Sequence, residues 1–277
     1  MPEGPEVDHS ARKVHSLLAG WTLSQIILVG GPYLSNPKPK YSNFREKVST
    51  LEPHLIKKVY AVGKQMIFEL EGAQYAAMTA HFGMSGQWCL SPGDHHLLTI
   101  QARRKDGARR QLYFCDQRRF GTFGLLTSAE LNRKIKKMGL QVLSPFTISE
   151  LLHRLHKRPD AVLCDLLLDQ KVFSGVGNYL RADIMYVAQL HPLRTIGSLT
   201  KKEERRLYLA IRDVCRESVE ASATTCGNYD DPIHTGEYVC KVYGRDADDQ
   251  GRAVEKFQRK KRAVHWCPDV QVFGSKN

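Results

Sequence analysis

The sequence lacks any long apolar run. Its longest stretch with few charges, residues 75–90, contains His81 and Gln87 and falls short of the ~20 apolar residues that a membrane-spanning helix needs. The first residues, Met-Pro-Glu-Gly-Pro-Glu, are acidic and turn-rich, whereas a secretory signal begins with basic residues and an apolar core. We therefore expect neither a membrane span nor a secretory signal.

Cysteine is sparse and scattered. The seven cysteines lie far apart, and no two of them form a Cys-x-x-Cys pair. Such an odd, dispersed set argues against a disulfide framework and against a zinc site made of cysteine pairs. We expect reduced thiols in an intracellular, reducing compartment, with cytoplasm and nucleus not distinguished.

Acidic residues are outnumbered by basic ones. The chain has 41 Lys+Arg against 29 Asp+Glu, a net charge of +12, and only 9% aromatic residues. This excess favours a polyanionic partner, most simply nucleic acid, although a protein that is merely basic fits the charge as well. The 42% hydrophobic content over 277 residues excludes wholesale disorder and indicates one or two globular domains.

Hydrophobic spacing divides the chain into parts. Residues 5–19 have the spacing of a helix that Gly20 ends. Residues 22–126 contain short alternating apolar runs separated by glycine and proline, which predicts an antiparallel β sandwich or barrel of about eight strands. Helices are expected at 128–137, 147–156, 160–170, 178–188 and 199–222, the last opened by a capping box of Ser198 or Thr200 with Glu203 and closed by Gly227, and short strands at 237–243 and 262–266.

The N-terminus can carry chemistry. Removal of Met1 would leave Pro2 with a free secondary amine, and an α-amino group has a pKa near ~8 against ~10.4 for lysine. Such an amine can attack a sugar C1′ and form an iminium ion, while Glu3 gives or takes a proton. The alternative is an ordinary acidic helix start, with Glu3 and Glu6 favoured by the helix dipole.

Three other segments suit nucleic acid. The turn at Gly175–Asn178, after Lys171, can present backbone N–H groups to a phosphate, or it can be a plain turn between helices. Residues 116–121 (DQRRFG) and 83–86 (GMSG) combine arginines with exposed apolar tips suited to a base stack, or they are a solvated arginine pair beside a core phenylalanine. Residues 252–262 contain six basic residues and one acidic residue. Such a run can be a solvated charged face, a localisation signal, or a hairpin that binds a nucleic-acid backbone.

Together these segments resemble the formamidopyrimidine-DNA glycosylase and endonuclease VIII family of bifunctional base-excision repair enzymes. The resemblance covers nearly the whole chain in order. It rests on the MPEGPEV start, Gly63-Lys64, HFGMSG (81–86), DQRRFG (116–121), LLDQKVFSGVGNYLRADIMY (167–186), HP (191–192) and VYGR (242–245).

The resemblance implies an α+β, multi-domain fold. An N-terminal antiparallel β sandwich with a catalytic N-terminal helix would occupy residues 1–130, a helix-two-turn-helix domain 131–232 and a C-terminal finger 233–277. The implied partner is damaged DNA, bound by a monomer without cofactor or membrane.

The resemblance also implies roles for individual residues. Pro2 is the Schiff-base nucleophile, Glu3 the acid/base and Glu6 its neighbour that positions the N-terminus. Lys64 contacts phosphate and assists proton transfer. The remaining DNA-binding residues are Met84, Arg118 and Phe120, which fill the void left by an everted nucleotide, Arg119 on the backbone, and Lys171 and Asn178 at the phosphate-binding turn.

The finger departs from the bacterial pattern of two Cys-x-x-Cys pairs. Gln250 and Ala253 stand where the first pair belongs, and the second keeps only Cys267, opposite Val270. His265 and Cys267 supply at most two of the about four ligands that zinc needs. We therefore expect a zincless finger, as in the endonuclease VIII-like branch, and no metal.

Within the finger, Arg262 aligns with the family's arginine that reaches the lesion phosphates, and Lys261 and Arg259 remain alternatives. Residues 225–243 are shorter than the loop that caps 8-oxoguanine in purine-specific relatives. We therefore expect oxidised pyrimidines and ring-opened or hydantoin lesions as substrates, with weak 8-oxoguanine activity, followed by β,δ-elimination. The rival hypotheses are a non-catalytic damaged-DNA-binding protein and a ribosomal-type RNA-binding protein.

Overall fold

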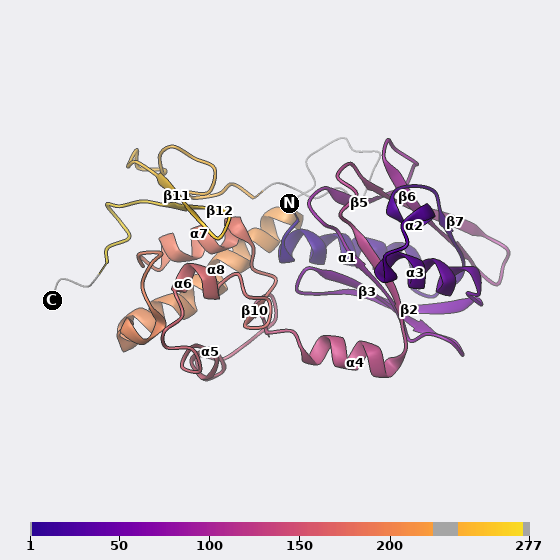
Figure 1. Cartoon of the computed structure of the whole chain (residues 1–277), viewed down its shortest axis with the longest axis horizontal. Helices are drawn as coiled ribbons and strands as arrows, with labels where there is room; N and C mark the ends of the chain where they lie inside the picture. Colours follow the sequence, from indigo (N-terminus) through magenta and orange to yellow (C-terminus); the bar gives the residue numbers. More distant parts are fainter. Residues whose placement is uncertain (1, 224–237, 274–277) are drawn as a thin grey trace. The chain divides into compact units, whose positions relative to one another are not determined.

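The computed structural model describes residues 2–223 and 238–273 (Figure 1). These residues divide into two compact units. The first, residues 2–136, holds the large sheet. The second, residues 137–222 with 238–273, holds helices α5 to α8 and a terminal hairpin.

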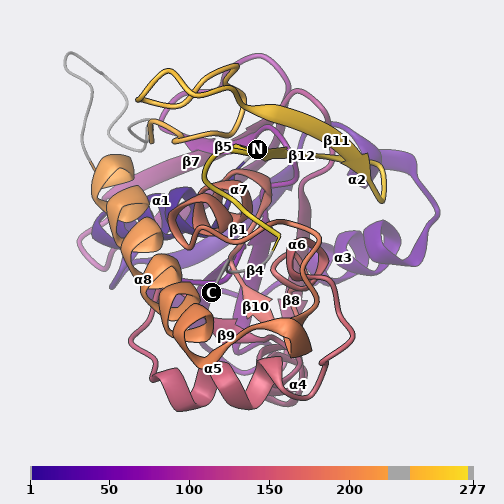
Figure 2. The ribbon, with the colours of Figure 1, turned by 90° about the vertical axis from the view of Figure 1, so that its left-hand side faces the viewer.

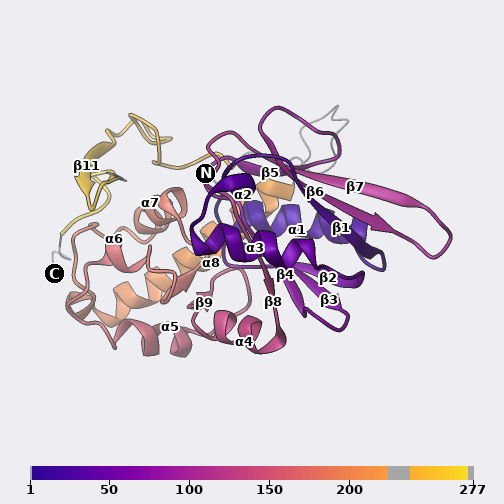
Figure 3. The ribbon, with the colours of Figure 1, turned by 45° about the vertical axis from the view of Figure 1, so that its right-hand side comes forward.

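Helix α1 (Gly4–Leu18) opens the first unit, as the periodicity predicts. Pro5 lies in its first turn, where a missing N–H costs nothing. Its apolar face buries Val7, Ala11 and Val14 against the sheet, chiefly over β2 and β3 (Figure 3). The helix that carries the N-terminus is therefore held by core packing along its length.

The predicted antiparallel β domain is confirmed. Eight strands form one sheet in the order β5-β7-β6-β1-β2-β3-β4-β8. Aromatic rings show that this sheet curls over on itself into a sandwich, because Phe68 of β3 lies 5.5 Å from Trp88 of β5, and Phe114 of β7 lies 4.8 Å from Phe123 of β8. The strands are β1 (Thr22–Leu28), β2 (His54–Val62), β3 (Gln65–Glu71), β4 (Ala77–His81), β5 (Gly86–Cys89), β6 (His96–Arg103), β7 (Arg109–Asp116) and β8 (Thr122–Leu126).

Two helices in this unit were not predicted. These are α2 (Pro32–Ser35) and α3 (Pro39–Ser49), which interrupt the expected run of strands. In α3, Tyr41 and Phe44 are buried against the core at helical spacing. The rest of α3 is polar, so its short apolar stripe is a weak signal beside the strands that flank it.

The second unit is helical, as predicted, with one correction (Figure 2). Instead of a helix at 160–170, only one turn forms, α6 (Leu163–Leu166). The chain bends after it because the Asp169 carboxylate accepts the backbone N–H of Lys171 at 2.9 Å. The other elements are α5 (Ile148–Leu155), α7 (Asn178–Val187), the 3-10 turn Ile196–Ser198, α8 (Lys201–Ala223) and the parallel pair β9 (Leu140–Gln141) and β10 (Phe173–Ser174), while α4 (Ser128–Lys136) belongs to the first unit.

The C-terminal hairpin is present, but its first strand was misplaced. The strand β12 (Arg262–Trp266) pairs with β11 (Glu255–Arg259), not with residues 237–243. Residues 238–243 contain no strand because the Asp183 carboxylate accepts the backbone N–H groups of Lys241 at 2.8 Å and Val242 at 3.1 Å. Within the described ranges, no helix is both long and apolar enough to cross a bilayer.

The capping box at the start of α8 is confirmed and belongs to a buried ion pair. The Thr200 backbone N–H donates to Glu203 Oε2 at 2.8 Å. Arg194 meets both carboxylate oxygens of Glu203, at 3.0 and 3.1 Å, and the two side chains are 6% and 4% exposed. Burial raises the pKa of Glu203, but the hydrogen bonds from Arg194 and Thr200 outweigh burial and hold that pKa below its ordinary value. The end of the capped helix predicted at Gly227 lies outside the described residues.

We expect Glu203→Gln to lower the free energy of unfolding by about 3–5 kcal/mol, because it leaves a buried guanidinium without its counter-charge. Urea unfolding at pH 7 measures this. Asp213→Asn is the control, since its ion pair with Arg216 on the same helix is exposed (44% and 62%) and contributes about 0–1 kcal/mol. The folded-state pKa of Glu203 is lowered, so the charged carboxylate stabilises the fold. The difference in free energy of unfolding between wild type and Glu203→Gln is therefore largest above the unfolded-state pKa, and it shrinks as the pH falls through the folded-state pKa.

Candidate active site and nucleic-acid interface

The N-terminus of α1 places Pro2, Glu3 and Glu6 together. The Glu3 backbone N–H donates to Glu6 Oε2 at 2.7 Å, and the two residues form a reciprocal capping box. Glu3 is 1% exposed, and Pro2 is half-buried at the end of the helix. The predicted nucleophile and acid/base are thus adjacent, and Glu6 fixes the backbone that carries them.

Lys64 lies at the end of the sheet where α1 begins. The β2–β3 hairpin turns through Gly63 and Lys64, with Gly63 at a φ of 58° that favours glycine. The Val59 backbone N–H donates to His15 Nδ1 at 3.1 Å, and α1 runs antiparallel to β2. From His15 back to Gly4 the helix rises about 17 Å. From Val59 to Lys64 the chain advances about 16 Å in the same direction. The turn with Lys64 and the start of α1 therefore lie at the same end of the sheet.

His81 links this turn to the next loop. It ends β4 opposite Gln65, the residue after Lys64, and its Nδ1 accepts the backbone N–H of Gly83 at 3.0 Å. Burial, followed by the charges of Lys64 and Lys134, lowers the pKa of His81. The ring is therefore neutral at physiological pH and can accept this bond, which orients the loop that carries Met84.

The loops at 83–86 and 116–121 pack against each other. Arg118 Nη1 lies 3.1 Å from Met84 Sδ. Gly83 has a φ of 65°, and a Cβ there would lie 2.7 Å from the Phe120 carbonyl carbon, so only glycine fits. Met84 and Phe120 remain 40% and 57% exposed. The structure therefore brings Met84, Arg118 and Phe120 together as one exposed tip.

Asp116 organises this tip and was missed in the sequence. Its buried carboxylate accepts Ser85 Oγ–H at 2.6 Å, the Gly121 N–H at 2.7 Å and the Arg118 N–H at 3.2 Å. The one sequence signal is an aspartate at the start of a turn, a position that commonly accepts backbone N–H groups. Arg119 is exposed in the same turn, with a φ of 56°.

In the second unit, Gln170 shapes the turn before α7. Its side-chain N–H donates to the Val176 carbonyl at 2.8 Å, and its Oε1 accepts the Gly175 N–H at 3.1 Å. Asn178 begins α7, and its Oδ1 is buried without a hydrogen bond to the described residues. Lys171 is exposed on the same turn. The N-terminus of α7 and the exposed Lys171 are groups that attract anions.

The basic residues of the hairpin differ in whether they form ion pairs. Arg259 and Lys260 form ion pairs with Asp165 of α6, at 2.8 and 3.0 Å. Arg262 is exposed and takes part in none of the ion pairs found in residues 2–223 and 238–273. Asp165 therefore neutralises Arg259, whereas Arg262, and beside it the exposed Lys261, keep charges that no ion pair among the described residues neutralises.

A polar cluster holds the loop beside this hairpin. The buried Asp248 carboxylate accepts hydrogen bonds from Tyr186 Oη at 3.0 Å and Arg252 Nε at 2.7 Å, and Cys267 Sγ lies 3.8 Å away. Burial raises the pKa of Cys267. His265 is also buried, against the Tyr243 ring. Among the residues the structure describes, no three His, Cys, Asp or Glu side chains gather as a metal site.

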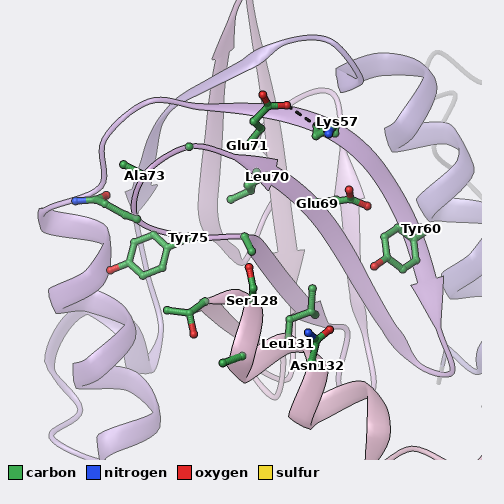
Figure 4. Close-up of a pocket in the computed structure, with 15 residues that line it drawn as sticks. Lys57, Tyr60, Glu69, Leu70, Glu71, Ala73, Tyr75, Ser128, Leu131 and Asn132 are labelled. Atoms are coloured by element: carbon green, nitrogen blue, oxygen red, sulfur yellow. Dashed lines mark ion pairs between the residues drawn. The ribbon is translucent and has the colours of Figure 1, made fainter.

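The first unit has a separate cavity of about 780 Å³ beside β2, β3 and α4 (Figure 4). Lys57 and Glu71 form an ion pair at 3.4 Å on its wall, and Tyr75 and Ser128 also line it. It contains none of the site residues predicted from the sequence.

Comparison with known proteins adds to this geometry. Residues 1–123 match the formamidopyrimidine-DNA glycosylase N-terminal domain, and residues 138–230 match the H2TH domain of the same family. The chain is 33% identical over 284 residues to formamidopyrimidine-DNA glycosylase of Thermus thermophilus, covering 99% of this chain and 100% of that protein.

Solved structures agree. The crystal structure of the MutM (Fpg) protein of Thermus thermophilus superposes with a TM-score of 0.80 at 31% identity, covering 99% of this chain and 100% of that one. The Lactococcus lactis Fpg in complex with DNA containing an abasic site gives a TM-score of 0.81 over 97% of this chain and 99% of that one, and its 22% identity shows the shared fold. The chain therefore belongs to the formamidopyrimidine-DNA glycosylase family, the DNA glycosylases of base excision repair.

Proposed function

We propose that the chain removes oxidised bases from damaged DNA and cleaves the resulting abasic site, with Pro2 as the nucleophile. The observation that supports this proposal is that the half-buried Pro2 directly precedes the buried Glu3 at the start of α1, where Glu6 holds the Glu3 backbone N–H. A secondary amine and a carboxylate held side by side are the groups that Schiff-base chemistry requires.

The reaction would begin at the Pro2 nitrogen. The Pro2 nitrogen forms a bond to C1′ as the glycosidic bond breaks, and the base leaves with that electron pair and a proton. Ring opening gives an iminium at C1′ as Glu3 delivers a proton to O4′. The Glu3 carboxylate then takes the C2′ proton as the 3′ phosphate leaves. A second elimination, in which solvent takes the C4′ proton, expels the 5′ phosphate, and water releases the sugar fragment from Pro2. No metal or nucleotide cofactor enters these steps.

The other site residues would bind the DNA. The exposed tip of Met84, Arg118 and Phe120 has the shape and chemistry to enter a base stack, which offsets part of the cost of extruding a base. Phosphates would be contacted by the basic and amide side chains Arg119, Lys64, Lys171, Asn178 and Arg262.

We also propose that the chain has three domains, at residues 1–130, 131–232 and 233–277.

For substrates, we propose oxidised pyrimidines and ring-opened or hydantoin lesions, with slower release of 8-oxoguanine. The sequence argument for this preference concerns residues 225–243, of which 224–237 lie outside the described residues. We expect faster excision of thymine glycol than of 8-oxoguanine from matched duplexes, measured under single-turnover conditions. Faster release of 8-oxoguanine would overturn the preference without affecting the family assignment.

Borohydride reduction tests the reaction itself. With a duplex containing one abasic site, reduction should trap a covalent protein–DNA adduct, and without reductant the products should carry phosphate at both ends of the gap. Tight binding of damaged duplex with neither adduct nor cleavage would instead indicate a non-catalytic damaged-DNA-binding protein.

A further inference from the structure

A cavity of about 620 Å³ in the second unit is lined by residues of both α6 and the hairpin. Its lining includes Asp165 of α6, Arg181 of α7, and Arg259, Lys260 and Arg262 of the hairpin. Arg181 is 1% exposed and donates to the Ala263 carbonyl at 2.8 Å, which fastens β12 to α7. The tip of the hairpin is held separately, by Asp165.

Asp165 forms a bidentate ion pair with Arg259. Arg259 Nε donates to Asp165 Oδ1 at 3.0 Å and Arg259 Nη2 donates to Oδ2 at 2.8 Å, while Lys260 Nζ lies 3.0 Å from Oδ2. The Asp165 side chain is 16% exposed. Burial raises the pKa of Asp165, but the hydrogen bonds and charges of Arg259 and Lys260 outweigh it and hold the pKa below its ordinary value. The carboxylate therefore stays charged at neutral pH.

The hairpin turn depends on outside support. Lys260 and Lys261 both have left-handed backbone conformations, with φ of 47° and 63°. Two-residue turns of this shape favour Asn-Gly, and residues other than glycine are strained in this conformation. Two adjacent lysines also repel each other. The ion pairs with Asp165 offset both costs at the point where the chain reverses.

The ion pair between Asp165 and Arg259 also determines where Arg262 lies. Arg262 lies directly opposite Arg259 in the β11–β12 ladder, so fixing Arg259 fixes the backbone from which Arg262 projects. Like charges directly opposite each other destabilise a strand pair. Asp165 neutralises Arg259 and reduces this repulsion, and Arg262 is left exposed with its charge unneutralised.

We propose that Asp165 is a positioning residue for the glycosylase reaction. It holds Arg259 and Lys260 against α6 and so sets where Arg262 presents its guanidinium to the phosphates of the bound lesion. This inference rests on the proposed function, in which Arg262 contacts those phosphates.

The test uses Asp165→Asn in the full chain, with cleavage of an abasic-site duplex measured under single-turnover conditions. We expect the rate constant to fall by about 10- to 100-fold, as when a reacting group is displaced by about 1 Å. Asp165→Glu should recover part of the rate. Asp246→Asn is the matched control, because it removes one equal charge and one ion pair to the same hairpin, with Lys256 at 3.4 Å, away from the turn. That control should cleave at the wild-type rate, and urea unfolding should show all variants folded.

A double-mutant cycle separates positioning from mere stabilisation. If Asp165 acts through Arg262, then Asp165→Asn should have little further effect in an Arg262→Gln background. An equal fold-loss in both backgrounds, or a wild-type rate for Asp165→Asn, would overturn the proposal, as would an Arg262→Gln variant with full activity. If the wild-type protein gives no trapped adduct, the proposed function fails instead, which is a distinct outcome.

Discussion

Retaining Met1, by inserting a lysine between Met1 and Pro2, should reduce abasic-site cleavage by at least about 10³-fold, because the nucleophilic amine no longer lies next to Glu3. Pro2→Gly should also lose the trapped adduct. Glycine would offer a primary amine on a flexible backbone, whereas the proline ring fixes φ and gives an iminium that needs no further protonation to act as an electron sink. Borohydride trapping and single-turnover cleavage measure both effects.

DNA binding provides the control for these N-terminal variants. The exposed tip and the phosphate-binding residues are unchanged in them, so affinity for a duplex with an uncleavable abasic analogue should remain near the wild-type value. Survival of the adduct in both variants would contradict Pro2 as the nucleophile. Lys64 would then be the first amine to replace, since its hairpin turn lies at the same end of the sheet as the start of α1.

The sequence predicted the parts of the fold and of the site that depend on local signals. The α1 start, the Gly63-Lys64 turn and the capping box of Thr200 with Glu203 each lie within a few residues and were found where expected. Glycine spacing and residue type are enough for such features, because the backbone geometry they require is set over one turn.

Contacts between distant residues were not predictable in this way. Asp116 accepts from Ser85 across 31 positions, and Asp165 pairs with Arg259 across 94. A single sequence carries no signal for such pairings, although they decide how the loops are presented. The misplaced first strand of the hairpin has the same origin, since residues 238–243 are rich in strand-forming residues but are bound through their backbone by Asp183.

Glu3→Gln should slow base release and elimination by about 10²- to 10⁴-fold, the range for a general acid/base, while leaving DNA affinity near the wild-type value. Glutamine keeps the shape of the side chain and can still accept a backbone N–H at the helix start, but it cannot carry the proton that ring opening and elimination require. Single-turnover rates on a lesion duplex and on a preformed abasic site measure the two steps separately.

Glu46→Gln is the control for the change in net charge. Glu46 is an exposed acid on α3 of the same unit, so its replacement changes the net charge equally and should leave both rates unchanged. Glu6→Gln should give a smaller loss than Glu3→Gln, because Glu6 acts on the backbone of Glu3 and not on the substrate. A Glu3→Gln rate within about threefold of wild type, well below the range for a general acid/base, would remove Glu3 from the mechanism and leave it as the N-cap of α1.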